Sequence, residues 1–181
     1  MRIGIIDIET TGFLNAGGKI VEVGMVSLDT ETGDIVPELS FICREPGLTP
    51  RDRNAWIFSN SDLTAEKVRH AEPLATFLPD IQELVDSCDF VTAYNKTFDF
   101  DFLGDRGVSF PNQWPCPMKR ATNLCKLPGK RGGYKWPKVP EAWHFLFPDA
   151  PYIEAHRGLD DATYEAKIIY ELYKLGLMEP A

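Results

Sequence analysis

Hydrophobic and polar positions alternate along the first quarter of the chain in a way that is typical of strands. Residues 2–8 are apolar on both faces, which predicts a buried central strand. The runs at 19–28 and 35–44 are also strand-like, and the polar stretch between them contains Gly33, which predicts a hairpin. Pro37 lies within the third run and favours an edge strand or a bulge, because proline cannot donate to a sheet ladder.

The rest of the pattern is mainly helical. Residues 74–87 carry apolar side chains at helical spacing, which predicts an amphipathic helix. We expect shorter helices over 61–70 and 97–105, with a short strand at 89–93. A C-terminal helix presents one apolar face, made by Leu159, Ala162, Ala166, Ile169 and Tyr173.

This order of elements predicts an α/β layer fold with a mixed sheet. The chain has 181 residues, of which 44% are hydrophobic, and we expect a single domain over 1–181. Asp7 interrupts the first apolar run and 18 consecutive apolar residues occur nowhere, so we expect neither a signal peptide nor a membrane span. The four cysteines form no C-x-x-C pair, which favours reduced thiols in a cytoplasmic protein.

The charge distribution bears on the partner. A net charge of −8 disfavours nucleic acid at first, because phosphate binding usually requires a basic surface. The segment 112–140, however, carries seven basic residues and no acidic one. It is interpreted either as an edge that follows a phosphate backbone or as a solvated loop. Within it, cations and aromatic rings are interleaved in a mixture suited to single strands: Lys130, Arg131, Tyr134, Lys135 and Trp136.

Two carboxylates lie at the end of the first predicted strand. Asp7 and Glu9 are two residues apart, so their side chains share one face, where like charges repel. A divalent cation would offset that repulsion, and hard oxygen ligands favour Mg²⁺ or Mn²⁺. Thr10, Thr11 and Gly12 follow, and the glycine permits a ligand to approach the backbone closely. A solvated pair of carboxylates is the alternative for this pattern taken alone.

The second group is Tyr94-Asn95-Lys96-Thr97-Phe98-Asp99, which follows the short strand. Asp99 is expected in the first turn of a helix, where the helix dipole stabilises a negative charge, and this structural role is the alternative. Asp101 lies about 200° round the helix, so the two cannot both face one site. We favour Asp99 because Leu103 lies on its side and would hold that face inward.

The third group is His156-Arg157-Gly158-Leu159-Asp160-Asp161, at the start of the C-terminal helix. This spacing lets an imidazole and a carboxylate approach one site from the same helix end. Histidine can accept a proton from water near neutral pH. Asp160 competes with Asp161, but Asp161 is next to Ala162 of the apolar face and is better placed. Taken alone, either member of the group could be structural.

The three groups together resemble a known family. DIETTG at 7–12, YNKTFD at 94–99 and HRGLDDA at 156–162 are similar to the three motifs of the DEDDh exonucleases. That family includes the proofreading subunit of bacterial DNA polymerase III, RNase T and the TREX nucleases. The resemblance runs from about Ile3 to Tyr173 and implies an RNase H-like fold. In that fold a five-stranded mixed sheet, with its first three strands antiparallel, is flanked by helices.

The resemblance also implies an activity and a role for each position. It implies a 3′→5′ exonuclease that releases nucleoside 5′-monophosphates from DNA or RNA. Two divalent ions, Mg²⁺ or Mn²⁺, would be bound by Asp7, Glu9, Asp99 and Asp161, and His156 would be the general base. Phe13 resembles the position where relatives place an apolar side chain against the terminal base. The expected substrate-binding set is Thr10, Gly12, Phe13, Asn95, Lys130, Arg131, Tyr134 and Trp136.

The sequence departs from the family pattern in two places. Tyr94 stands where many relatives have histidine, and the segment 114–143 does not align, which leaves substrate preference open. The expected partner is nucleic acid, through a single-stranded 3′ end, with a polymerase or another replication or repair protein as a further partner. Two alternatives stay open: a binding module that docks on a polymerase or replisome protein, and a hydrolase of very short oligonucleotides like the related oligoribonucleases.

Overall fold

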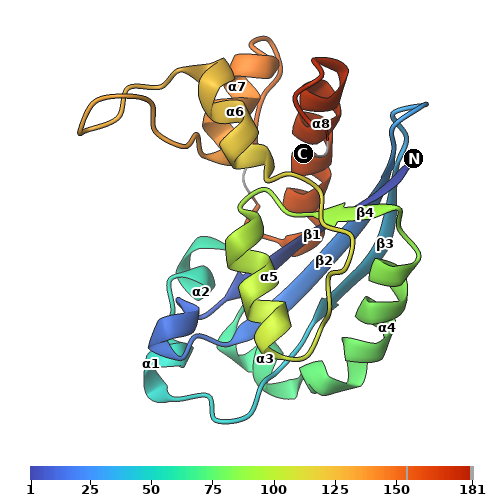
Figure 1. Cartoon of the computed structure of the whole chain (residues 1–181). Helices are drawn as coiled ribbons and strands as arrows, with labels where there is room; N and C mark the ends of the chain where they lie inside the picture. The colour runs from blue at the N-terminus through green and yellow to red at the C-terminus, as the bar shows by residue number, and fades with distance from the viewer. Residues whose placement is uncertain (154, 180–181) are drawn as a thin grey trace.

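A four-stranded mixed sheet forms the centre of the computed structural model, which describes residues 1–153 and 155–179 (Figure 1). The strand order is β3-β2-β1-β4. The strands are β1 (Arg2–Thr10), β2 (Ile20–Asp29), β3 (Ile35–Ile42) and β4 (Phe90–Thr92). β1, β2 and β3 are antiparallel, whereas β4 is parallel to β1. The predicted α/β class, the mixed sheet and the antiparallel first three strands are therefore confirmed.

Helices connect and cover the strands. Among the described residues they are η1 (Leu14–Ala16), α1 (Pro50–Arg53), α2 (Ile57–Asn60), α3 (Ala65–His70), α4 (Leu74–Asp86), α5 (Lys96–Asp105), α6 (Pro117–Cys125), α7 (Val139–Leu146) and α8 (Gly158–Lys174). The helix expected over 61–70 begins later than predicted. Thr64 caps it, since the Thr64 hydroxyl accepts a hydrogen bond from the Lys67 amide at 3.1 Å.

The expected count of five strands was wrong for the described part of the chain. Residues 112–114 run beside β4, and two backbone hydrogen bonds of 2.8 Å join Val91 to Asn112 and Trp114. The pairing stops at a single isolated bridge. Pro111 and Pro115 flank this segment, and proline has no amide hydrogen with which to extend a ladder.

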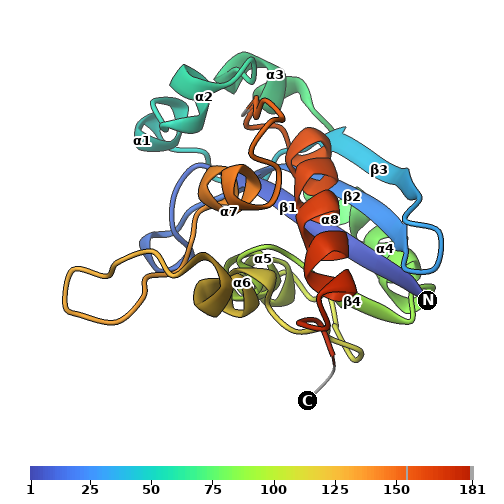
Figure 2. The same cartoon turned by 90° about the horizontal axis from the view of Figure 1, so that it is seen from above.

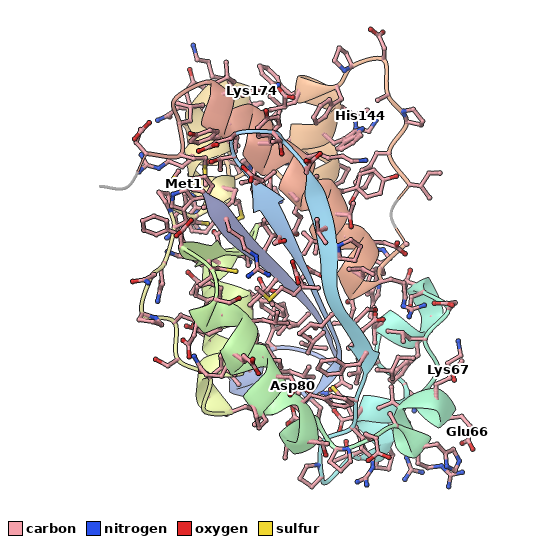
Figure 3. All side chains as sticks on the ribbon, turned by 90° about the vertical axis from the view of Figure 1, so that its right-hand side faces the viewer. Met1, Glu66, Lys67, Asp80, His144 and Lys174 are labelled. Carbon is pink, nitrogen blue, oxygen red and sulfur yellow. The ribbon has the colours of Figure 1, made fainter. Side chains whose placement is uncertain are left out.

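An apolar core lies on each face of the sheet. Ile3 and Ile5 of β1 belong to the core beneath α8, whereas the even-numbered isoleucines of the strand belong to the core beneath α4 and α5. α8 lies on one side of the sheet and α4 on the other, as seen from the β3 edge in Figure 3 and from above in Figure 2. Because side chains alternate along a strand, Asp7 and Glu9 continue the odd-numbered row and face α8.

The first turn of α8 lies directly against β2. A Cβ atom added to Gly24 would be 2.1 Å from the carbonyl carbon of Gly158. A Cβ atom added to Gly158 would be 2.8 Å from the Gly24 amide nitrogen and 3.1 Å from the Asp7 carbonyl oxygen. Only residues without side chains allow this approach. The glycine pair thereby sets the start of α8 over the end of β1.

This contact predicts that two glycine-to-alanine substitutions differ greatly in their effect on the free energy of unfolding. Gly24→Ala should lower the free energy of unfolding by about 1–3 kcal/mol, because the added methyl group meets backbone atoms that cannot move aside. Gly104→Ala on α5 is the matched control: its Cβ would meet no atom within 4 Å, and alanine stabilises a helix interior by about 0.5–1 kcal/mol relative to glycine. Urea unfolding measures both, and equal effects would contradict the close approach.

Candidate active site

The short length of β4 leaves part of the β1 edge open to α5. β4 pairs only with Ile3 to Ile5 of β1. Beyond that point the Ile8 amide donates to Oδ1 of Asp99 at 3.2 Å, so the carboxylate takes the place of a strand partner. The first turn of α5 therefore delivers Asp99 to the strand end that carries Asp7 and Glu9.

The two candidate aspartates of α5, and likewise those of α8, differ in solvent exposure. Asp99 is 4% exposed, whereas Asp101 is exposed. Asp161 is 9% exposed and its Oδ2 accepts a hydrogen bond from the Arg157 amide at 3.2 Å, whereas Asp160 is exposed. The inward positions are thus those that the helical spacing favours.

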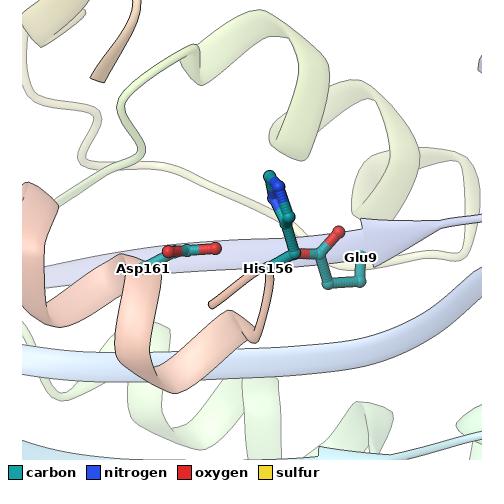
Figure 4. Close-up of side chains that lie close together, drawn as sticks. All are labelled: Glu9, His156 and Asp161. Atoms are coloured by element: carbon teal, nitrogen blue, oxygen red, sulfur yellow. The ribbon is translucent and has the colours of Figure 1, made fainter. Parts of the chain in front are cut away.

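An imidazole joins the carboxylates at the start of α8. Glu9, His156 and Asp161 each offer a potential ligand atom, and these atoms lie within 4.8 Å of one another (Figure 4). His156 adopts a positive φ of 51°, which is uncommon for a residue with a side chain. The ring of Trp56 packs edge-on to the imidazole, with centroids 4.7 Å apart and planes at 77°, and so restricts its movement.

Arg157 ties the loop that carries His156 to the sheet. Its Nε and Nη2 atoms donate to the carboxylate of Glu22 on β2 at 2.7–3.0 Å, and Nη1 donates to Asp62 at 2.7 Å. Glu22 is 1% exposed and also accepts a hydrogen bond from the Gly158 amide at 3.1 Å. These hydrogen bonds hold the pKa of Arg157 above its ordinary value. A buried carboxylate with this many donors is a rigid anchor.

Glu165 is a buried carboxylate that the motif analysis missed. It lies one turn after Asp161 on α8, is 4% exposed, and its Oε2 accepts a hydrogen bond from the Tyr94 amide at 3.3 Å. A signal was present in the sequence, because a residue four positions after Asp161 lies on the same face of the helix. The motif analysis also missed Glu22. The sequence signal for it was a single charged residue within an otherwise apolar strand.

Repulsion among the carboxylates changes their protonation. Burial, followed by the charges of Glu165 and Asp99, raises the pKa of Asp7 well above its ordinary value. Burial raises the pKa of Asp99 to about 8, against the opposing effect of the hydrogen bond from Ile8. The pKa of Glu165 is also raised, first by burial and then by its acidic neighbours. Hard oxygen donors crowded beside one imidazole fit a divalent cation such as Mg²⁺ or Mn²⁺.

Two cavities are lined by residues of the predicted substrate-binding set. The smaller, of about 380 Å³, contacts Glu9 and is lined by three residues of the predicted substrate-binding set: Thr10, Gly12 and Phe13. The larger, of about 800 Å³, is lined by Phe13, Asn95 and Trp136 of that set. Neither cavity is lined by the remaining members of the set, Lys130, Arg131 and Tyr134. These three belong to residues 126–138, a segment that projects from the body between α6 and α7 and is called the arm (Figures 1 and 2).

Comparison with known proteins identifies the family. A family model described as RNase_T exonuclease matches residues 5–169. The chain therefore belongs to this exonuclease family, and the resemblance to DEDDh exonucleases is confirmed. No curated protein matches the chain. None of the helices in the described part of the chain is both long and apolar enough to cross a membrane.

Solved structures share the fold at low identity. A full-length 3′-exonuclease is 18% identical with a TM-score of 0.70, over 98% of this chain and 62% of that one. Exonuclease I of E. coli in complex with a dT13 oligonucleotide is 15% identical with a TM-score of 0.72, over 94% and 40%. The nuclease domain of 3′hExo, a DEDDh family member bound to rAMP, is 18% identical with a TM-score of 0.68, over 98% and 94%. The chain thus spans less than two thirds of the first two proteins.

The raised carboxyl pKa values predict that the stability of the folded protein falls with rising pH, and that a bound cation opposes this loss. Between the ordinary value of 3.8 and about 8, folded Asp99 binds more protons than unfolded Asp99, so stability falls as pH rises through this window. In a chelating buffer the melting temperature should therefore decrease from pH 5 to pH 8. Added Mg²⁺ should raise it more at pH 8 than at pH 5.

The matched variant is Asp99→Asn, whose amide oxygen can still accept the hydrogen bond from Ile8. Thermal unfolding of this variant in chelator should depend less on pH than that of the wild type. An identical pH dependence in the two proteins would contradict the raised pKa of Asp99.

Proposed function

We propose that this protein is a divalent-metal-dependent 3′→5′ exonuclease that releases nucleoside 5′-monophosphates from a nucleic-acid strand. The observation that carries the proposal is the convergence of Glu9, His156 and Asp161 within 4.8 Å, beside the carboxylates of Asp7 and Asp99. Membership of the exonuclease family supports it. The oligonucleotide bound to E. coli Exonuclease I and the rAMP bound to 3′hExo support a nucleic-acid 3′ end as the substrate.

Asp7, Glu9, Asp99 and Asp161 would hold two divalent ions, Mg²⁺ or Mn²⁺. When bound, such ions supply positive charge to the scissile phosphate and to the leaving oxygen. The raised pKa of Asp7 supports this role, because a bound cation favours the charged form of a carboxyl group that its neighbours disfavour. Glu165 lies one turn behind Asp161 and adds to the negative charge that attracts the cations.

His156 would act as the general base. As the oxygen of a water molecule forms a bond to phosphorus, a nitrogen of His156 takes the proton of that water. The bond from phosphorus to the 3′-oxygen of the shortened strand breaks, and this oxygen takes a proton from solvent. Trp56 and the Arg157–Glu22 ion pair hold the imidazole beside Glu9 and Asp161, so little reorientation is needed.

The smaller cavity would bind the terminal nucleoside. It adjoins Glu9 and is bordered by the backbone of Gly12 and the rings of Phe13 and Trp56. Phe13 is 70% exposed, so its ring is available for stacking without any rearrangement of the core. Thr11 fixes this loop, because its hydroxyl donates to Asp52 at 2.7 Å and accepts from the Lys19 amide at 3.0 Å.

Asp7→Ala should abolish trimming of a labelled single strand in Mg²⁺, a loss of at least a thousandfold, while the fold is retained. In chelator the variant should melt no lower than the wild type, because it removes a carboxyl group whose charged form is disfavoured by burial and by its acidic neighbours. Asp160→Asn is the control: it removes an exposed carboxylate from the same motif region and should leave the rate within twofold. Full activity of Asp7→Ala would end the proposal.

Substitutions of Glu22 and Asp62, the two partners of Arg157, should differ in their effect on kcat. Glu22→Gln weakens the buried anchor, and we expect kcat to fall about tenfold, or ~1.4 kcal/mol, with KM changed little. The reason is that the anchor positions His156 and touches no substrate. Asp62→Asn weakens only the exposed partner and should change kcat less than twofold. Steady-state kinetics on one oligonucleotide test the pair, and equal effects would show that Glu22 has no positioning role.

A further inference from the structure

We propose that Glu165 is a positioning residue of the cation site. It fixes the segment that leads to Asp99 against the helix that carries Asp161, and its own charge strengthens cation binding. This inference rests on the proposed function, because it concerns the carboxylates that would hold the ions. Glu165 lies outside the three motif segments that resemble the family, the last of which ends at Ala162.

Glu165 lies on the face of α8 that is turned toward the carboxylates. It follows Asp161 by four residues, or about one helical turn, so the two side chains share one face of the helix. Asp161 itself points toward Glu9 and His156 (Figure 4). Glu165 is 4% exposed, and its Oε2 accepts a hydrogen bond from the Tyr94 amide at 3.3 Å. A buried carboxylate thus joins the C-terminal helix to the turn before α5.

The segment from Tyr94 to Asp99 passes from one face of the sheet to the other. Tyr94 belongs to the core beneath α8, whereas Phe100 and Leu103 of α5 belong to the core beneath α4 and α5. Asp99 lies at the end of this crossing, where the Ile8 amide donates to its Oδ1 at 3.2 Å. The position of Asp99 therefore depends on how both ends of the crossing segment are held.

Glu165 holds the first end of the crossing segment. Because its carboxylate accepts the hydrogen bond from Tyr94, the start of the segment is tied to α8 one turn after Asp161. The approach of Gly158 to Gly24 in turn places the start of α8 over the sheet. These contacts join the sheet, α8 and the start of α5 around the end of β1, and the link between α8 and α5 depends on a single side chain.

A charged acceptor at this position is less favourable for the folded protein without a cation than a neutral one. The amide oxygen of glutamine could accept the same hydrogen bond from Tyr94 without adding a charge. Burial first, and then the charges of Asp99 and Asp161, raise the pKa of Glu165. Burial first, and then the charge of Glu165, raise the pKa of Asp7. A divalent cation at the end of β1 would offset this repulsion, so the charge of Glu165 strengthens cation binding without a direct bond to the ion.

Binding of Mn²⁺ to the whole chain without substrate tests the charge, and the EPR signal of the free ion measures it. Glu165→Gln keeps an acceptor for the Tyr94 amide and removes the charge, so the Kd for Mn²⁺ should rise about tenfold. Glu171→Gln is the matched control on α8. It removes a carboxylate that is 30% exposed and paired with Lys174, and it should leave the Kd within about twofold of the wild type. An equal Kd in the wild type and Glu165→Gln would overturn the proposal.

Trimming of one oligonucleotide at increasing Mg²⁺ tests the positioning. Glu165→Gln should need about tenfold more Mg²⁺ for its half-maximal rate, while kcat at saturating Mg²⁺ stays within about threefold. Glu165→Leu also removes the acceptor and leaves the buried Tyr94 amide without a partner, so its kcat should fall about tenfold even at saturating Mg²⁺. A purely structural role would lower kcat in both variants and leave the Mg²⁺ dependence unchanged, which would contradict the proposal.

The inference and the proposed function fail in different ways. If the wild type trims and Glu165→Gln matches it in Mn²⁺ affinity and Mg²⁺ dependence, Glu165 has no role at the cation site and the exonuclease stands. If the wild type trims no strand while its Mn²⁺ affinity still depends on Glu165, the exonuclease is overturned and the role of Glu165 in cation binding stands.

Discussion

Crowded negative charge at the end of β1 is the feature on which the rest of the site depends. Asp7, Asp99, Asp161 and Glu165 come from three elements. Burial raises the pKa values of Asp7, Asp99 and Glu165, and the charges of acidic neighbours add to the effect on Asp7 and Glu165. The apolar cores on both faces of the sheet hold these elements together in spite of the repulsion. Folding thus creates a demand for positive charge at one point, which a divalent cation would meet.

Small residues and one buried ion pair set the geometry around that charge. Gly24 and Gly158 allow α8 to contact β2, so that the first turn of the helix reaches the strand end. Arg157 and Glu22 then fix the loop that follows the arm and α7. The fixed imidazole of His156 and the buried carboxylate of Asp161 are consequences of the same helix start. A change in this contact would therefore move the imidazole of His156 and the carboxylate of Asp161 together.

The larger cavity is built differently from the carboxylate cluster. Carboxylates and imidazole come from the segments that match the family motifs, whereas the larger cavity uses Trp136 and Lys119 from a segment that does not align with them. The whole length of this chain corresponds to the nuclease domain of 3′hExo, to less than two thirds of the full-length 3′-exonuclease, and to less than half of E. coli Exonuclease I.

The sequence by itself determined which residues of each element face inward. Spacing along the strand placed Asp7 and Glu9 on one face, and spacing round a helix favoured Asp99 over Asp101, because both periodicities are local properties of the backbone. Tertiary structure alone decided which inward faces meet. Three features depend on residues that are distant in sequence. They are the contact of Gly24 with Gly158, the ion pair of Glu22 with Arg157, and the short pairing beside Val91 that forms no fifth strand. Such contacts depend on how the cores on the two faces of the sheet pack. A short-range sequence pattern does not predict this packing.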